Sequence, residues 1–201
     1  MLTRTLRTLT AALLLTALVA VGAVGTSQAS VAAHRDGAAE VTGPMTVARL
    51  KVRPIPAVCD FRAARYVDGV HPDSPGPYYS FAEIVGAGDT AGRFNLQAKV
   101  GDLTGDGVAD GVIVTACTYG GNWVYFNAFA YRSDGTRMGR LPVESYIASV
   151  GFEPTYPTVS ITNREARLRV NAYRRGDAHC CPSITTNLRL RWNGSRFVRV
   201  I

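Results

Sequence analysis

The chain has 201 residues with 22 basic and 15 acidic side chains, and Arg dominates the basic set because Lys occurs only at positions 51 and 99. The formal net charge is +7, and it falls to +5 without Arg4 and Arg7 at the N-terminus. An excess this small does not indicate a nucleic-acid partner, although it suits loose attraction to anionic polymers.

The first 29 residues have the three parts of a secretory signal peptide. Arg4 and Arg7 give a positive start, and an apolar run of 14 residues follows at 11–24. Ser-Gln-Ala at 27–29 then places small residues where a signal peptidase cuts. Because the apolar run is shorter than the ~20 residues of a membrane-spanning helix, we expect residues 1–29 to be removed and no transmembrane segment to remain. The expected location is extracellular, in contact with the cell wall.

Residues 30–45 are small and polar without periodicity, which predicts a disordered leader. Residues 46–201 then form one β-rich extracellular domain. Several prolines interrupt its beginning, and between them the stretch 57–66 is predicted as the one short helix, closed by Gly69. The following segment at 78–85 is predicted as a strand.

From residue 97 onward the pattern is that of strands. Val112–Cys117 is a β-branched run that is apolar on both faces, which predicts a central strand. A second strand is predicted at 123–131. Apolar and polar residues alternate at 166–173 and 188–192, and Asn193-Gly194 predicts a hairpin turn into a last strand. The predicted fold class is mainly β, α+β at most, with a single antiparallel-sheet domain, one short helix and two disulfides.

All four cysteines lie beyond the predicted signal: Cys59, Cys117, Cys180 and Cys181. An even number in an exported chain predicts two disulfides. Three pairings are open, and one of them is a vicinal Cys180–Cys181 bond that strains the peptide between the two residues. We favour a pairing in which Cys59 and Cys117 each bond one member of the adjacent pair.

Oxygen-bearing residues recur at regular spacing between 101 and 110. With Asp102 as position one, oxygen donors fall at positions three, five, seven (a backbone carbonyl) and nine, that is, at Thr104, Asp106, Val108 and Asp110. Gly107 at position six permits a sharp turn. This spacing wraps oxygens around a hard cation, and it predicts a Ca²⁺ site.

The same segment resembles the calcium loop of FG-GAP and related DxDxDG proteins, in which a strand follows the loop. Thr104 replaces the usual Asp or Asn, and Ile113 stands where an EF-hand has its bidentate Glu. These departures predict weak binding, roughly in the 10⁻⁴–10⁻³ M range of extracellular sites. The alternative interpretation is an Asp-Gly turn held by side-chain-to-backbone hydrogen bonds.

The C-terminal half resembles the LppP/LprE family of actinobacterial exported proteins and lipoproteins. The matching features, in order, are the strand 110–118, the aromatic strand 123–131, Arg-Val-Asn-Ala-Tyr-Arg at 169–174, Gly-Asp-Ala-His-Cys-Cys-Pro-Ser at 176–183 and Leu-Arg-Leu-Arg-Trp-Asn-Gly-Ser at 188–195. The resemblance covers residues ~100–201, with 97–201 as the family-like core. It implies a non-enzymatic protein outside the membrane. Many members carry a lipid-anchor Cys, which this chain lacks.

Four arginines fall on the polar phase of two alternating strands: Arg167, Arg169, Arg189 and Arg191. If these strands are neighbours, the four side chains form one basic face. Such a face would hold anionic cell-wall polymers, phospholipid headgroups or acidic glycans. The plainer interpretation is a solvated face of the sheet.

The sequence contains no nucleophile elbow, metalloprotease helix or phosphate-binding loop, so we identify no catalytic residue. We expect a secreted, non-catalytic envelope or extracellular binding protein, stabilised by Ca²⁺. Two alternatives remain: a secreted enzyme acting on cell-wall or extracellular polymers, and a protein-interaction or inhibitor module.

Overall fold

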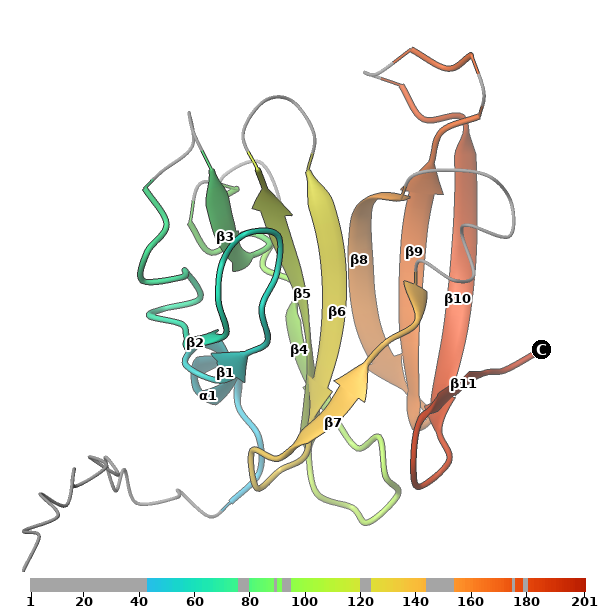
Figure 1. Ribbon diagram of the computed structural model, residues 1–201. Coiled ribbons are helices and arrows are strands. Elements are labelled where there is room, and N and C mark those ends of the chain that lie inside the picture. The colour runs from blue at the N-terminus through green and yellow to red at the C-terminus, as the bar shows by residue number, and fades with distance from the viewer. Residues whose placement is uncertain are drawn as a thin grey trace, which may run out of the picture. The chain divides into compact units, whose positions relative to one another are not determined.

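The computed structural model is mainly β and confirms the predicted fold class (Figure 1). The structure describes residues 43–75, 80–88, 90–91, 95–119, 124–143, 154–174 (side chains from 158), 176–178 and 181–201. The elements in these residues are α1 Val47–Lys51, β1 Pro54–Ile55, β2 Ala64–Arg65, β3 Phe81–Ile84, β4 Ala98–Gly101, β5 Asp110–Thr118, β6 Tyr125–Tyr131, β7 Arg137–Arg140, β8 Pro154–Thr162, β9 Glu165–Ala172, β10 Ile184–Trp192 and β11 Phe197–Arg199.

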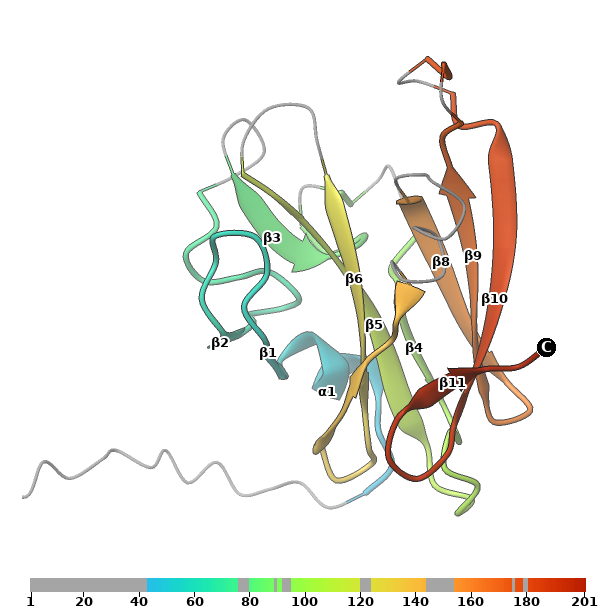
Figure 2. The ribbon, with the colours of Figure 1, turned by 45° about the vertical axis from the view of Figure 1, so that its right-hand side comes forward.

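The strands form three antiparallel sheets rather than the single sheet expected from the sequence. The larger sheet has the order β3-β5-β6-β7, with β4 also paired to β5, and the smaller has the order β11-β10-β9-β8. Strands β1 and β2 make a separate two-stranded sheet. The larger sheet lies between the smaller sheet and the N-terminal elements in both ribbon views (Figures 1 and 2).

Strand β5 is buried at every residue, which confirms the predicted central strand. Val112 and Val114 belong to a core between the two larger sheets, whereas Ile113 and Cys117 belong to a second core on the opposite face. A strand covered on both faces needs apolar side chains in both phases. The continuous apolar run of β5 therefore follows from its position.

Strands β9 and β10 keep the predicted alternation. Leu168 and Leu188 are buried in the core between the sheets, and Arg169 and Arg189 are exposed on the other face. Since successive side chains of a strand point to opposite faces, one face of the smaller sheet is packed and the other meets solvent.

The second core is covered by a layer made of residues 45–71, which we call the N-terminal layer. Leu50 of α1, Ile55 and Tyr66 are each at most 1% exposed in this core, and full burial of such a side chain contributes roughly 1.5–3 kcal/mol. The Tyr131 hydroxyl donates to the Pro54 carbonyl at 3.0 Å and joins the layer to β6. Met45 is also buried, so the domain includes a residue that the sequence pattern assigns to the leader.

The predicted helix at 57–66 is wrong. Val58 and Phe61 form an isolated β-bridge instead, and Ala64–Arg65 is strand β2. Cys59, inside the bridge, has φ 49, which a right-handed helix does not allow. The short helix lies earlier, at Val47–Lys51, where the Thr46 hydroxyl accepts the Arg49 backbone N–H at 3.2 Å.

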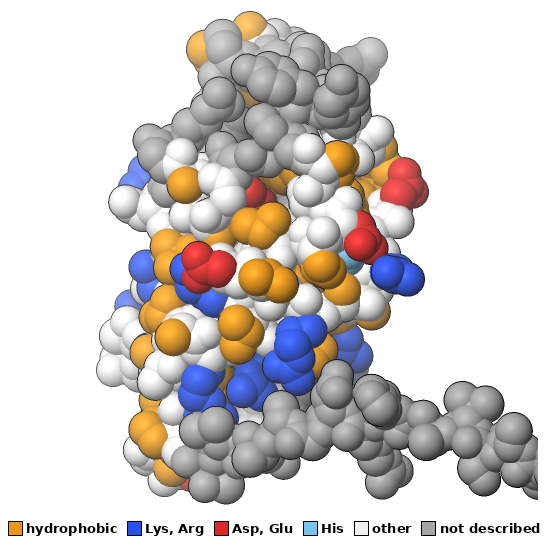
Figure 3. Space-filling model, turned by 90° about the vertical axis from the view of Figure 1, so that its left-hand side faces the viewer, with side chains coloured by type: hydrophobic (Ala, Val, Ile, Leu, Met, Phe, Trp, Pro, Cys, Tyr) orange, Lys and Arg blue, Asp and Glu red, His pale blue; other side chains and the backbone are white. Residues whose placement is uncertain are grey.

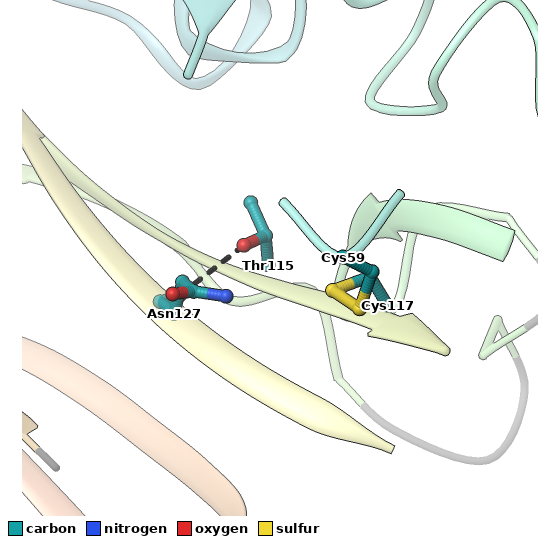
Figure 4. The surroundings of a disulfide bond; sticks show 4 residues. All are labelled: Cys59, Thr115, Cys117 and Asn127. Atoms are coloured by element: carbon teal, nitrogen blue, oxygen red, sulfur yellow. Dashed lines mark hydrogen bonds between the residues drawn. A yellow bond between two sulfur atoms is a disulfide. The ribbon is translucent and has the colours of Figure 1, made fainter. Parts of the chain in front are cut away.

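The favoured disulfide pairing is also wrong. Cys59 bonds Cys117, with a Cα–Cα distance of 6.1 Å, and this bond ties the N-terminal layer to β5 beside Thr115 and Asn127 (Figure 4). Cys59 and Cys117 are bonded to each other at the second core, so neither is bonded to Cys180 or Cys181. Cys181 is also disulfide-bonded, and Cys180 lies outside the described residues.

Candidate anion-binding site

Strands β8, β9 and β10 turn a polar surface away from the core, and we call their outward side chains the arginine face. Because β9 and β10 pair directly, the four arginines singled out in the sequence lie on one surface. The register places the outward side chains in three cross-strand rows: Thr158 with Arg169 and Asn187, Ser160 with Arg167 and Arg189, and Thr162 with Glu165 and Arg191.

Glu165 is the acidic member of the arginine face, and three arginines hold it. Arg189 donates twice, from Nε to Oε2 at 2.9 Å and from Nη2 to Oε1 at 3.0 Å. Arg191 donates from Nη2 to Oε1 at 2.8 Å, and Arg167 donates from Nε to Oε2 at 3.3 Å. The Glu165 side chain is 1% exposed, while those of Arg167, Arg189 and Arg191 are 39, 47 and 54% exposed. The paired bonds from Arg189 fix the geometry of both side chains.

The hydrogen bonds from Arg189 are the main reason that the pKa of Glu165 falls to about 2. Burial acts in the opposite direction, and Arg191 and Arg167 lower the pKa further. The same contact raises the pKa of Arg189 above its ordinary value. Glu165 is therefore ionised at neutral pH, and it offsets only part of the positive charge of this face.

Arg169 differs from the other three arginines. It is exposed, and its side chain makes no hydrogen bond or ion pair with any residue that the structure describes. It borders an open hollow of about 340 Å³ over the centre of the sheet. The polar side chains that line this hollow come from all three strands: Thr158, Ser160, Arg167, Arg169, Asn187 and Arg189.

Sequence reasoning missed Glu165 and the neutral lining residues. Glu165 stands two positions before Arg167, so the strand alternation alone places it on the same face. Thr158 and Ser160 flank buried Val159 in an alternating stretch, but the two prolines at 154 and 157 make this segment resemble a loop. A strand with prolines at its beginning is compatible with an edge position, which β8 occupies.

The acidic loop at 102–110 is held by hydrogen bonds from its own backbone. Asp102 accepts the Gly105 N–H at 2.5 Å on Oδ1 and the Gly107 N–H at 3.1 Å on Oδ2. Asp106 Oδ1 accepts the Val108 N–H at 2.8 Å. These contacts are of the kind that stabilises Asx turns.

Asp110 is buried and uses both carboxylate oxygens. Oδ2 accepts the N–H groups of Leu103 and Thr104, each at 3.1 Å, and Oδ1 accepts the Ser133 N–H at 3.0 Å. Burial raises the pKa of Asp110 even though these N–H groups act to lower it. The carboxylate thus connects the loop to the turn after β6.

The three loop carboxylates do not converge on a point. No three His, Cys, Asp or Glu side chains within the described ranges come close enough to hold a metal ion. The Arg164 guanidinium occupies the space beside Gly105, where it would clash with an added Cβ. The backbone hydrogen bonds of this loop agree with the Asp-Gly turn interpretation. Calcium binding at Asp102, Thr104, Asp106, Val108 and Asp110 stays a prediction.

Backbone N–H groups and the charge of Arg164 also affect the pKa of Asp102. Desolvation works to raise its pKa, but the N–H groups of Gly105 and Gly107, with Arg164, hold the pKa below its ordinary value. A guanidinium from the β8–β9 turn thus lies beside Gly105 of this loop.

Comparison with known proteins gives no functional assignment. No family model matches the chain, and no match exists among curated proteins or solved structures. Across the described part of the chain, no helix is both long and apolar enough to span a membrane.

Proposed function

We propose that this protein is an extracellular, non-catalytic binding module that holds anionic cell-wall polymers or acidic glycans on its arginine face. The observation that carries the proposal is the set of cross-strand rows, in which four arginines lie on one surface and only three of them are paired with the carboxylate of Glu165. Concentrated charge of one sign attracts polymers of the opposite sign.

Four further features support this location and partner class. The N-terminal sequence has the parts of a signal peptide, and the Cys59–Cys117 disulfide is compatible with an oxidising compartment. The resemblance to exported LppP/LprE proteins points the same way. Arg189 and Arg191 are held in place by Glu165, so less side-chain freedom is lost when an anion binds.

Charge reversal at Arg169 tests the proposal, because Arg169 has no partner among the described residues whose loss would disturb the fold. We expect the purified, oxidised protein to bind polyglycerol phosphate or polygalacturonate, and Arg169→Glu to weaken binding at least about tenfold. Higher salt should weaken the wild-type complex as well.

Arg137→Glu is the matched control. It makes the same change in net charge on exposed strand β7 of the other sheet. Isothermal titration calorimetry with each variant at two salt concentrations gives the comparison. Equal losses in both variants would show that only net charge matters, and undiminished binding by Arg169→Glu would exclude the arginine face.

A further inference from the structure

We propose that the hollow in the arginine face is a subsite for the phosphate group of a phosphodiester-linked wall polymer. This inference rests on the proposed function, because it names the anionic group that the same face holds. The groups that contact the phosphate are the polar side chains that line the hollow: Thr158, Ser160, Arg167, Arg169, Asn187 and Arg189.

The hollow offers hydrogen-bond donors and no acidic side chain. Its three arginines carry N–H groups that stay protonated at any ordinary pH. The hydroxyl groups of Thr158 and Ser160 and the amide of Asn187 make no side-chain hydrogen bond to the described residues, so they too are available to a ligand. Arg167 and Arg189 also donate to Glu165 beside the hollow, whereas Arg169 has no such partner among the described residues. Donors of this kind favour an anion that can accept several charge-assisted hydrogen bonds.

Glu165 shows how the same face binds a carboxylate. A carboxylate is planar, and the two parallel bonds from Arg189 satisfy both of its oxygens. The donors around the hollow instead come from three strands, and neighbouring strand axes lie about 4.8 Å apart. Along β9, the Cα atoms of Arg167 and Arg169 are about 6.6 Å apart, at about 3.3 Å per residue. Donors that approach from several sides suit the tetrahedral oxygens of a phosphate better than a planar group.

The size of the hollow favours a polymer over a lone ion. Its volume of about 340 Å³ is many times the ~10–15 Å³ that a cavity needs to hold one water molecule. Inorganic phosphate would fill only part of it, whereas a phosphodiester with a polyol or sugar on either side would fill it. The hollow is open to solvent, so the chain of such a polymer would continue across the sheet.

A lipid headgroup is the competing source of a phosphate. Surfaces that bind bilayers bury apolar side chains in the interface. None of the exposed large hydrophobic residues in the described chain belongs to β8, β9 or β10. Val52 and Val67 lie in the N-terminal layer instead, on the side of the molecule where Figure 3 shows apolar side chains among charged ones. We therefore assign the phosphate to a polymer.

Calorimetry at one ionic strength separates these ligands. We expect polyglycerol phosphate to bind at least about tenfold more tightly than polygalacturonate, and phosphatidylglycerol vesicles to bind more weakly than the phosphate polymer. Equal affinity for the two polymers would overturn the phosphate subsite and leave the proposed function standing. Tighter binding to vesicles would also overturn the inference. Absence of binding to both polymers would remove the subsite and the proposed function together.

Two variants locate the phosphate in the hollow. Arg169→Lys keeps the charge but loses the planar fork, and we expect it to weaken phosphate-polymer binding several-fold while Arg137→Lys has no effect. The double variant Thr158→Ala/Ser160→Ala keeps every charge, and we expect it to reduce the preference for phosphate over carboxylate. Unchanged affinity for the phosphate polymer in Arg169→Lys, together with an unchanged preference for phosphate in the double variant, would show that the polymer binds elsewhere.

Discussion

Leu50 of α1 fills the space that Gly111 leaves open on β5. A Cβ at Gly111 would lie 2.6 Å from Leu50 Cδ2 and 2.7 Å from Cδ1. Leu50 is fully buried, so its side chain has no free space into which it could move. The missing side chain at one position thus permits the N-terminal layer to dock on the central strand.

Changes to this contact should destabilise the domain in both directions. Gly111→Ala overpacks the contact and should cost about 1–3 kcal/mol, whereas Leu50→Ala leaves a cavity and should cost about 2–5 kcal/mol. Urea unfolding followed by tryptophan fluorescence measures both values. Leu50→Met, which conserves volume, is the control and should cost less than ~1.5 kcal/mol. Little loss in Leu50→Ala would mean that the helix docks elsewhere.

The sequence predicts strands well where one pattern continues over many residues. The apolar run of β5 and the alternation of β9 and β10 depend on which faces of each strand are buried. Because buried positions take apolar residues, the order of apolar and polar residues shows these faces directly. The N-terminal layer has no such pattern. Its Val58–Phe61 bridge encloses Cys59, whose disulfide partner Cys117 is 58 residues away in the sequence, and local propensity carries no information about such a contact.

The candidate site was predictable only in part. The alternation identifies the four arginines as one phase, but the sequence does not show that β8 adds two hydroxyl-bearing residues beside them. Nor does it show which arginines hold Glu165 and which stays unpaired. Both facts come from the pairing of strands, which is a tertiary property.

The Cys59–Cys117 bond should be a major source of stability. It closes a segment with a sequence separation of 58, and the chain-entropy model gives about 4 kcal/mol for restricting the unfolded chain by a loop of that length. The variant Cys59→Ala/Cys117→Ala should lower the urea midpoint accordingly. The oxidised wild type is the reference, with the disulfide verified by mass spectrometry after alkylation. A midpoint that does not change would mean that the N-terminal layer remains ordered in the unfolded state.

One measurement distinguishes the two interpretations of the acidic loop at 102–110, a Ca²⁺ site and an Asp-Gly turn. Since its carboxylates are already engaged by backbone N–H groups, we expect the same melting temperature in EDTA and in millimolar Ca²⁺. Asp102→Ala should lose about 1–2 kcal/mol in both buffers, because it removes two hydrogen bonds.

Calcium binding would change that pattern. At ten times its dissociation constant, Ca²⁺ would stabilise the native state by about 1.4 kcal/mol. A Ca²⁺-dependent rise in melting temperature that Asp106→Ala abolishes would establish the metal site that the sequence predicts.

Acid should weaken the arginine face through Glu165. Its pKa is about 2 in the folded protein, against 4.5 for the ordinary group, because Arg189 and its neighbours stabilise the charged form. A folded-state pKa below the unfolded value adds stability above about pH 4.5, and this contribution is lost as the pH falls toward 2. Glu165→Gln should therefore be less stable than wild type at pH 7, and the difference should shrink between pH 4.5 and pH 2.

The measurement is the urea midpoint of both proteins at pH 7, 4 and 2. Arg169→Ala is the matched control, because it removes a charge from the same face without contacting Glu165, and it should keep the wild-type pH dependence. A constant difference between wild type and Glu165→Gln at all three pH values would show that the ionised carboxylate does not stabilise the fold. In that case Arg189 and Arg191 would be held by packing alone, and their readiness to bind an anion would not depend on Glu165.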